Sequence, residues 1–335
     1  MRDPDFWWED RSLAALLLRP AAFFYGAIAA NRMRRTGKRA NVPVICLGNF
    51  TLGGAGKTPA AIAVAKLLGD MGERPYFLTR GYGGTLSGPV QVDPAKHGAR
   101  DVGDEPLLLA RHAPVIVAHD RAAGAGFAES RGASAIVMDD GLQNPALQKD
   151  IVIAVVDTRR GIGNANVFPA GPLRAPLNAQ LGLVDALLWI GERPQRAAGV
   201  IEKARSRNIA VLQAQLKLDT AAIKALGRKK VLAFAGIGDP EKFFAALSAA
   251  DIEAAVEESF PDHHPYSADD ARRLLARCDE RGLIPVTTEK DFVRLAGSSE
   301  LKTLAARAKA LPANLEFKDE SAVRKLLEKA RTRRK

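Results

Sequence analysis

Short apolar runs separated by helical stretches dominate the chain after residue 40. The runs are rich in Val, Ile, Leu and Ala, and they lie at 42–49, 74–81, 113–120, 133–140, 151–157, 185–191 and 210–216. Continuous apolar runs of this length are typical of strands whose two faces are both buried. Their alternation with helical stretches predicts an α/β fold built on a doubly wound, mostly parallel sheet.

A second α/β unit follows the first one. It opens with the apolar run 231–238, continues with a helical stretch, and contains further β-type runs at 284–288 and 315–317. We therefore predict a larger domain over 41–225 and a smaller α/β domain over 226–335.

The segment before residue 40 has a different pattern. Residues 12–30 are almost entirely apolar and are interrupted by Arg19 and Pro20, with two tryptophans ahead of them and a basic run at 32–39 behind them. Tryptophan favours the membrane–water interface, and each basic residue near an anionic leaflet contributes roughly 1 kcal/mol. The pattern predicts a helical segment over 1–40 that associates with a membrane. The alternative is a core-packing pair of helices with a basic loop.

The formal net charge of the 335 residues is +11, which indicates an anionic binding partner. An excess of this size indicates an anionic lipid, a phosphorylated substrate or nucleic acid. The chain has no RRM, zinc or helix-turn-helix signature, so we expect no nucleic acid. Its two cysteines, Cys46 and Cys278, form no CxxC motif, which argues against a disulfide scaffold or a zinc site and favours a reducing cytoplasm.

A phosphate-binding loop follows the first apolar run. Gly56, Lys57 and Thr58 stand between that run and a helical stretch, which is the context of a P-loop. In such a loop the Lys reaches the β- and γ-phosphates and the Thr hydroxyl ligates Mg²⁺. The predicted nucleotide-binding residues are Thr51, Leu52, Gly53, Gly54, Ala55, Gly56, Lys57 and Thr58. The chain departs from the motif GxxxxGKS/T at one position, because Thr51 stands where the motif has its first Gly. The extra glycines of the loop compensate for this departure.

We expect this loop to bind an adenine nucleotide together with a magnesium ion. Asp139 and Asp140 end an apolar run, and an acidic residue at a neighbouring strand end holds Mg²⁺ in P-loop proteins together with the loop hydroxyl, here Thr58. Asp157 ends another run and is a weaker candidate. The sequence TEKD at 288–291 lacks the spacing of the N/TKxD element that selects guanine, which favours ATP over GTP.

A kinase that acts on a hydroxyl needs a group that accepts the hydroxyl proton. Asp104 and Glu105 stand in a Gly/Pro-flanked loop before a helix, where a helix cap is the simpler reading on spacing alone. Asp262, His263 and His264 lie between two prolines, and a histidine paired with a carboxylate can tune a base. The residues alone leave the choice between these groups open.

Taken together, these segments resemble the tetraacyldisaccharide 4'-kinases of lipid A biosynthesis. The matching motifs are LGNFTLGGAGKTP (47–59), TRGYGG (79–84), VGDEP (102–106), MDDGLQ (138–143), FPAGPLR (168–174), FPDHHPY (260–266) and TTEKD (287–291). They extend through most of the chain, and their combination is distinctive. The altered start of the P-loop is also found in this family.

The resemblance implies a reaction and a place for it. ATP would phosphorylate the 4'-hydroxyl of a tetraacylated glucosamine disaccharide 1-phosphate to give a product of the lipid IVA type. The reaction would occur at the cytoplasmic face of the inner membrane of a Gram-negative bacterium, with the enzyme held as a peripheral or monotopic protein. The implied partners are this lipid disaccharide and the anionic membrane surface, the implied cofactors are ATP and Mg²⁺, and no obligate protein partner is evident.

The resemblance also implies roles for single residues. Asp104 would be the general base, and His263 would pair with it and raise its basicity. Arg174 would stabilise charge on the transferring phosphate. His264 is the alternative partner of Asp104, and Ala175 stands where the family often has Glu, so the role of that Glu does not carry over. The base pair would span the two domains and assemble when they close.

Two other functions fit part of the pattern. A soluble small-molecule kinase would have a dispensable N-terminus and a water-soluble acceptor. A membrane-bound P-loop ATPase that switches a partner protein would hydrolyse ATP without making a phosphorylated lipid. The VGDEP and FPDHHPY motifs favour a kinase, because a switch ATPase needs no acceptor base.

Overall fold

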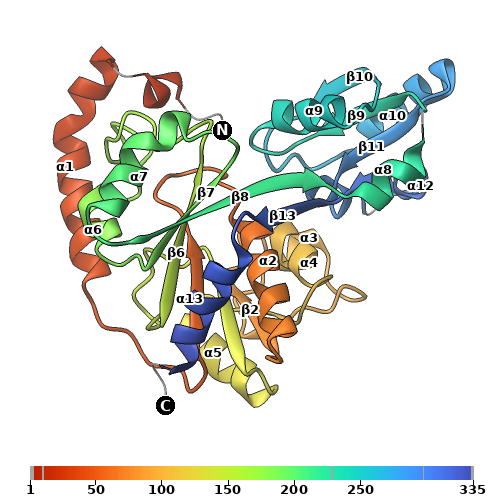
Figure 1. Cartoon of the computed structure of the whole chain (residues 1–335). Helices are drawn as coiled ribbons and strands as arrows, with labels where there is room; N and C mark the ends of the chain where they lie inside the picture. Colours follow the sequence, from red (N-terminus) through yellow and green to blue (C-terminus); the bar gives the residue numbers. More distant parts are fainter. Residues whose placement is uncertain (1–3, 10, 228, 297, 333–335) are drawn as a thin grey trace.

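The computed structural model describes residues 4–9, 11–227, 229–296 and 298–332, and its larger domain is built on a nine-stranded sheet (Figure 1). The strands are β1 (Val44–Gly48), β2 (Pro75–Thr79), β3 (Val90–Gln91), β4 (Val115–Val117), β5 (Ala135–Asp139), β6 (Ile151–Asp157), β7 (Ala186–Ile190), β8 (Ala210–Leu218) and β13 (Ala313–Phe317). Their order is β13-β8-β7-β6-β1-β5-β2-β4-β3. All neighbours pair in parallel except β3 with β4 and β13 with β8, so the sheet is mostly parallel, as predicted.

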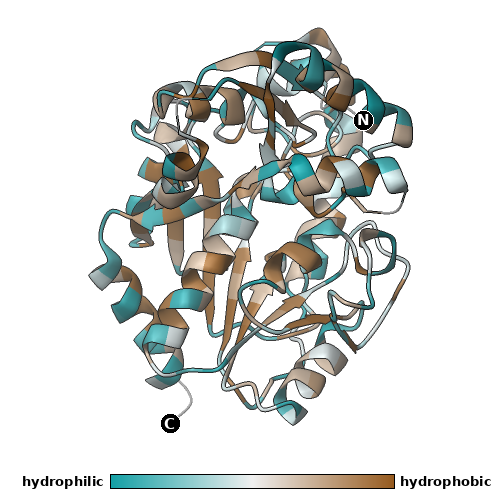
Figure 2. Cartoon of the chain, turned by 90° about the vertical axis from the view of Figure 1, so that its right-hand side faces the viewer, coloured by the Kyte–Doolittle hydropathy of each residue, from teal (hydrophilic) through white to brown (hydrophobic). Residues whose placement is uncertain are grey.

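Helices cover both faces of this sheet, which confirms the doubly wound fold. One face packs against α2 (Lys57–Asp70), α4 (Asp104–Leu109) and α13 (Glu320–Thr332), and the other against α5 (Arg121–Ser130), α6 (Leu177–Leu181) and α7 (Ala198–Arg205). The larger domain also contains the short elements η1 (Asp5–Trp8), α3 (Ala99–Val102) and η2 (Gln195–Ala197). The strands are apolar on both faces, and Figure 2 shows them as brown ribbons between the helices.

The smaller domain has a parallel sheet of its own. Its strands are β9 (Val231–Ala235), β10 (Ala254–Ser259), β11 (Ile284–Thr288) and β12 (Lys309–Leu311), in the order β10-β9-β11-β12. Helices α8 (Thr220–Leu226) and α9 (Pro240–Ala249) pack on one face, and α10 (Ala268–Arg281) and α12 (Ser299–Arg307) pack on the other. The single-turn helix α11 (Glu289–Phe292) follows β11 directly and faces the larger domain through its contacts with α4.

The end of the chain differs from the prediction. The sequence analysis places 315–317 in the smaller domain, but β13 pairs antiparallel with β8 of the large sheet, with Leu315 opposite Leu216. Helix α13 then packs Val323 and Leu327 into the core of the larger domain. Both faces of the small sheet are already covered, so the apolar stripe of α13 finds its partner on the large one. The chain therefore leaves the smaller domain after β12.

Helix α1 (Leu13–Met33) runs along the outside of the larger domain (Figure 1). It is continuous through Pro20, so the alternative of two core helices is wrong. Its inward face is made of small buried residues, among them Ala15, Ala22 and Gly26. Its outward face carries the large exposed residues Leu13, Leu16, Leu17, Phe23, Phe24, Tyr25 and Ile28. This polarity is the reverse of that of a soluble helix, and it suits a helix that meets lipid.

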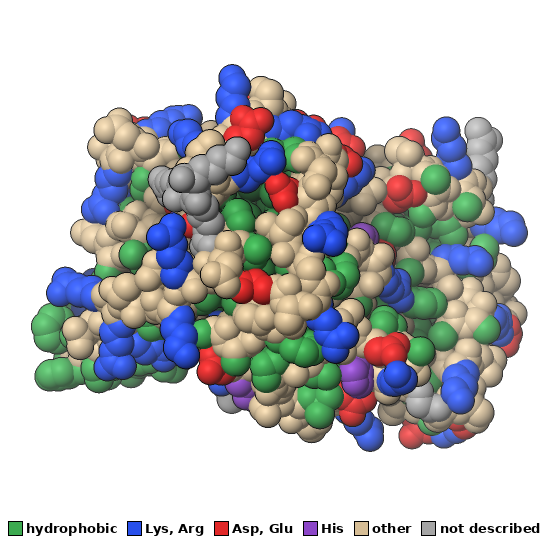
Figure 3. All heavy atoms as spheres, turned by 90° about the horizontal axis from the view of Figure 1, so that it is seen from below, with side chains coloured by type: hydrophobic (Ala, Val, Ile, Leu, Met, Phe, Trp, Pro, Cys, Tyr) green, Lys and Arg blue, Asp and Glu red, His purple; other side chains and the backbone are tan. Residues whose placement is uncertain are grey.

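The length and composition of α1 agree with this interpretation. Within the described part of the chain, α1 is the helix that is long and apolar enough to cross a membrane, and only 17% of its apolar window is buried. Behind it, Arg32, Arg34, Arg35, Lys38 and Arg39 are all exposed. Figure 3 shows a band of apolar side chains at the edge of the molecule with Lys and Arg side chains beside it. The predicted N-terminal apolar helix is therefore present.

The tryptophans ahead of α1 do not both behave as the sequence suggests. Trp7 is buried, its Nε1 donates a hydrogen bond of 3.0 Å to the carbonyl oxygen of Pro169, and its ring meets Phe168 edge to face. Trp8 lies under the guanidinium of Arg160. Trp7 therefore anchors the start of the chain to the protein rather than to a membrane interface.

Candidate active site

The predicted phosphate loop connects β1 to α2. Gly53 and Gly56 have φ angles of 87° and 84°, values that strain any residue with a side chain. A Cβ atom on Gly56 would lie 2.6 Å from Cδ1 of Ile190. Glycine is therefore required at position 56, and the unpaired N–H groups at the start of α2 are available to phosphate oxygens.

Lys57 begins α2, and its ammonium group lies between two acceptors. Its Nζ is 3.2 Å from Oδ1 of Asn49 and 3.8 Å from Oδ1 of Asp140. Asn49 is fully buried, and its Nδ2 donates a hydrogen bond of 3.2 Å to the carbonyl oxygen of Gly53, which ties the loop to the end of β1. Asn49 was not predicted as a site residue, although a polar residue directly after a buried strand is a usable signal.

Asp139 lies at the end of β5, the strand next to β1, and it is almost completely buried. It is 1% exposed, and its Oδ1 has no hydrogen-bond partner among the described residues. Burial, together with the charges of Glu105 and Asp140, raises the pKa of Asp139 to about 7. A buried carboxylate oxygen without a partner is costly unless a cation binds it. The environment of Asp139 therefore fits a metal ion.

Asp140 is already paired with cations. Its Oδ1 accepts a hydrogen bond of 2.7 Å from Nη1 of Arg174. Burial would raise the pKa of Asp140, but the charges of Lys57 and Arg174 hold it below its usual value. Arg174 is positioned by the P-loop itself, because its backbone N–H donates to the carbonyl oxygen of Phe50 at 2.9 Å and its Nε to that of Thr51 at 2.8 Å. Arg174, which was predicted to stabilise charge on the transferring phosphate, thus lies beside the loop.

Two side-chain amides, one of them buried, hold the same wall of the site together. Gln143 donates from Nε2 to the carbonyl oxygen of Asn49 at 2.8 Å and to Oε1 of Gln180 at 2.7 Å. Gln180 is fully buried and donates in turn to the carbonyl oxygen of Ala175 at 2.7 Å. Ala175 is itself fully buried, and its methyl group offers no ligand to a metal or a phosphate.

Arg121 is a further cation near the paired aspartates that the sequence analysis did not single out. It begins α5, and its Nη1 donates to the carbonyl oxygen of Ala118, while its Nε has no partner among the described residues. Burial lowers the pKa of Arg121, and the charges of Asp140 and Asp139 oppose that shift. The charged residue in the sequence HDR after an apolar run was the available signal.

Asp104 and His263, predicted as base and partner, are in contact across the two domains. Nδ1 of His263 is 3.0 Å from Oδ2 of Asp104, and Asp104 is 6% exposed. Asp104 begins α4, where its Oδ1 accepts the N–H of Glu105 at 2.9 Å. His264 contacts a different carboxylate, because its Nε2 is 3.0 Å from Oδ2 of Asp270 in the smaller domain. The geometry therefore selects His263 over His264.

Two cations surround this pair. Nζ of Lys290 is 3.2 Å from Oε1 of Glu105 and 3.3 Å from Nε2 of His263. Nε of Arg294 donates to Oδ2 of Asp104 at 2.8 Å. Burial would raise the pKa of Asp104, but the hydrogen bond with His263 and the charges of Lys290 and Arg294 hold it well below its usual value. This contradicts the expectation that His263 raises the basicity of Asp104, because these donors stabilise the charged form.

A second contact joins the two domains at the end of β6. Nζ of Lys242 donates to Oδ2 of Asp157 at 2.7 Å, and Nη2 of Arg160 donates to the carbonyl oxygen of Gly238 at 3.0 Å. Asp157, the weaker metal candidate, is therefore occupied by a lysine of the smaller domain. The domains therefore contact each other both at the end of β6 and around Asp104, where His263, Lys290 and Arg294 of the smaller domain reach α4.

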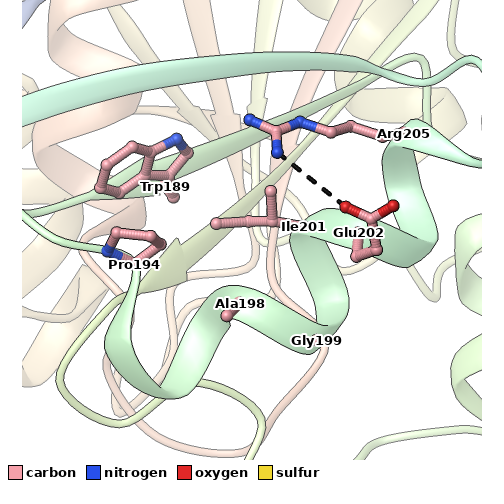
Figure 4. Close-up of a pocket in the computed structure, with 7 residues that line it drawn as sticks. All are labelled: Trp189, Pro194, Ala198, Gly199, Ile201, Glu202 and Arg205. Carbon is pink, nitrogen blue, oxygen red and sulfur yellow. Dashed lines mark ion pairs between the residues drawn. The ribbon is translucent and has the colours of Figure 1, made fainter.

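Other surface features add no ligand to the site. A cavity of about 410 Å³ beside α7 is lined by Trp189, Pro194, Ala198, Gly199, Ile201, Glu202 and Arg205 (Figure 4). None of these is a predicted site residue, and the ion pair of Glu202 with Arg205 is long, at 4.0 Å. Within the described ranges, no cluster of three or more His, Cys, Asp or Glu side chains could hold a metal. The candidate active site is therefore the P-loop with Asp139, Asp140 and the interdomain pair.

Comparison with known proteins shows which family the chain belongs to. A profile of the family Tetraacyldisaccharide-1-P 4'-kinase matches residues 14–331. Tetraacyldisaccharide 4'-kinases from Rhodopseudomonas palustris BisA53 and Nitrobacter hamburgensis are 54% and 52% identical, covering 98% of this chain and 95% and 97% of theirs. The crystal structure of LpxK from Aquifex aeolicus in complex with ATP superposes with a TM-score of 0.71 at 25% identity, covering 94% of this chain and 99% of the other. The chain belongs to the tetraacyldisaccharide-1-P 4'-kinase family.

Proposed function

We propose that this protein transfers the γ-phosphate of ATP to the 4'-hydroxyl of a tetraacyldisaccharide 1-phosphate, the step of lipid A biosynthesis that gives a lipid IVA type product. The observation that carries this proposal is the contact between Asp104 and His263, at 3.0 Å, beside a phosphate-binding loop. A P-loop alone serves switches as well as kinases. Transfer to an alcohol needs a base that accepts the hydroxyl proton, and Asp104 of the larger domain, held by His263 of the smaller one, supplies such a group.

The P-loop would hold and polarise the nucleotide. Its N–H groups and the ammonium of Lys57 would bind the β- and γ-phosphates, and Arg174 would face the transferring group with its guanidinium. Lys57 and Arg174 both lie within ion-pair distance of Asp140, at 3.8 Å and 2.7 Å. Cations held in this way need no rearrangement as charge develops on the phosphoryl oxygens, which lowers the barrier.

A magnesium ion fits the residues beside the loop. The buried Oδ1 of Asp139 has no partner among the described residues, and oxygen atoms are the ligands that Mg²⁺ prefers. Thr58 and Asp139 would hold the ion, with Asp140 next to them. When bound, the ion would supply positive charge that offsets the negative charge of the nucleotide phosphates.

Asp104 would accept the proton of the attacking hydroxyl. The donors around it keep its carboxylate ionised at neutral pH, so the acceptor form is always populated. His263 would hold the carboxylate through its Nδ1–H, which fixes the histidine tautomer. Correct placement of such a base contributes about 10²–10⁴-fold to the rate.

Helix α1 would bring the site to its acceptor. The exposed apolar face of α1 and the basic segment 32–39 behind it suit insertion into an anionic membrane surface. We infer peripheral or monotopic attachment to the cytoplasmic face of the inner membrane, where ATP and the acyl chains of the acceptor are both present.

The test is an incubation of the protein with ATP, Mg²⁺ and the tetraacyl disaccharide 1-phosphate in detergent, followed by mass analysis. We expect a gain of one phosphate on the lipid. Asp104→Ala should lose nearly all product and retain ATP binding, whereas Lys57→Ala should lose both. Turnover of water-soluble acceptors alone would favour a small-molecule kinase, and ATP hydrolysis without a phosphorylated lipid would favour an ATPase switch; either result would contradict the proposal.

A further inference from the structure

The guanidinium group of Arg294 lies buried between the two domains. Arg294 follows α11 in the smaller domain, and its side chain is 6% exposed. Both its Nε and its Nη2 donate to Asp104 of the larger domain. Both contacts are made to Oδ2, the oxygen that also faces His263. An Arg that addresses a carboxylate with two N–H groups fixes its orientation as well as its charge.

Arg294 is itself held from behind by Asp291. Nη1 of Arg294 donates to Oδ1 of Asp291 at 2.9 Å and to the carbonyl oxygen of Gly236 at 2.8 Å. Asp291 is fully buried and accepts the hydroxyl of Tyr266 at 3.0 Å and that of Thr288 at 2.6 Å. The orientation of the guanidinium is therefore fixed by contacts within the smaller domain, independently of its contact with Asp104.

We propose that Arg294 is a positioning residue for phosphoryl transfer: it directs the Asp104 carboxylate so that its second oxygen faces the acceptor hydroxyl. Among the residues that the structure describes, three donors reach Oδ2, whereas Oδ1 accepts one backbone N–H, from Glu105 at 2.9 Å. A carboxylate oxygen offers two lone pairs, so Oδ1 keeps one free for the incoming proton. This inference rests on the proposed function, since it assigns Arg294 a part in that reaction.

The charges around Asp104 make the effect of Arg294 measurable. His263 contacts the Asp104 carboxylate from the loop after β10, and Lys290 of α11 contacts His263 in turn. The Glu105 carboxylate accepts from Lys290, and Asp262 lies 3.8 Å from Nε2 of His263. Removing the positive charge at position 294 leaves Asp104 with fewer stabilising partners. An opposite charge at this range lowers an Asp pKa by about 1–3 pH units, so its removal raises the Asp104 pKa by a similar amount.

The experiment compares three variants with the wild-type protein in the lipid phosphorylation assay across pH. Arg294→Gln should lower kcat by roughly 10²-fold, as expected for a displaced catalytic group, with the KM for ATP unchanged. The acid limb of its pH–kcat profile should move to higher pH. Arg294→Lys keeps the charge and loses the fork, so its acid limb should stay in place while kcat falls less. Arg272→Gln removes an exposed arginine of the same domain, and it should match the wild type.

A measurement without turnover separates this inference from the proposed function. The ¹³Cγ signal of Asp104, assigned with Asp104→Asn, should stay at the carboxylate position down to the lowest pH at which the wild-type protein is folded, and should titrate at higher pH in Arg294→Gln. An unmoved signal in the folded variant overturns the inference even if lipid is phosphorylated. If Arg294→Gln does not fold, Arg294→Lys decides: wild-type kcat overturns the inference, and a reduced kcat with an unmoved acid limb supports it.

Discussion

Replacing Asp139 by Asn should stabilise the nucleotide-free protein at neutral pH, although it removes a residue of the active site. Asp139 is 1% exposed, and its Oδ1 has no partner among the described residues. The folded protein therefore holds this carboxylate in a place that disfavours its charge. Asn has nearly the same shape and carries no charge.

The magnitude follows from the difference between the folded and unfolded pKa. Burial raises the pKa of Asp139 to about 7, whereas an aspartate in an unfolded chain titrates near pH ~3.9. Between these two values the folded state binds the proton more tightly, so stability falls by about 1.4 kcal/mol for each unit that the pH rises. Below pH ~3.9 there is no effect, and above pH 7 the full loss of about 4 kcal/mol remains.

Urea denaturation followed by tryptophan fluorescence measures this directly, because Trp7, Trp8 and Trp189 all lie in the larger domain. Wild-type and Asp139→Asn proteins are compared in EDTA from pH 5 to pH 8. We expect the free-energy advantage of the variant to grow by roughly 2–3 kcal/mol over this range. A difference that does not change with pH would refute the reasoning, because any effect of the amide on packing is independent of pH.

Three other substitutions test separate parts of the structure. Gly56→Ala should abolish ATP binding in calorimetry, since the φ of 84° at this position strains any residue with a Cβ, which would also lie 2.6 Å from Cδ1 of Ile190; normal affinity would contradict the loop geometry. Phe23→Asp charges the outer face of α1 and should weaken flotation with anionic vesicles by roughly 10- to 100-fold, and unchanged flotation would count against membrane contact there. Lys242→Met removes the ion pair of 2.7 Å with Asp157 and should enlarge the radius of gyration in small-angle scattering, whereas an identical profile would mean that this pair does not hold the domains together.

The predictable part of the fold was the part with both faces buried. The apolar runs of the large sheet became β1, β2, β4, β5, β6, β7 and β8. Strand β10 escaped prediction because its sequence AAVEES places polar side chains on an exposed side. The return of 313–317 to the large sheet was also not predicted, because the sequence of a short strand does not identify which of two sheets it pairs with.

The predictable part of the site was the part that is contiguous in sequence. Gly53 to Thr58 lie in one loop, and the motif alone orders them. Arg294 and Asp104 are 190 positions apart, and only the packing of α11 against α4 brings them together. The pairing of Asp104 with His263 was proposed from a family resemblance, and local pattern would have assigned Asp104 to a helix cap.

The way in which the chain enters and leaves the smaller domain has a mechanical consequence. It enters from β8 and returns through β13, and these strands are hydrogen-bonded neighbours with Leu218 opposite Ala313. At the crossing itself, the N–H of Asp219 donates to the carbonyl oxygen of Pro312 at 2.9 Å. The two linkers are thus hydrogen-bonded to each other where the chain passes between the domains. We propose that the smaller domain pivots about these paired linkers, which would move Arg294 and His263 together relative to Asp104.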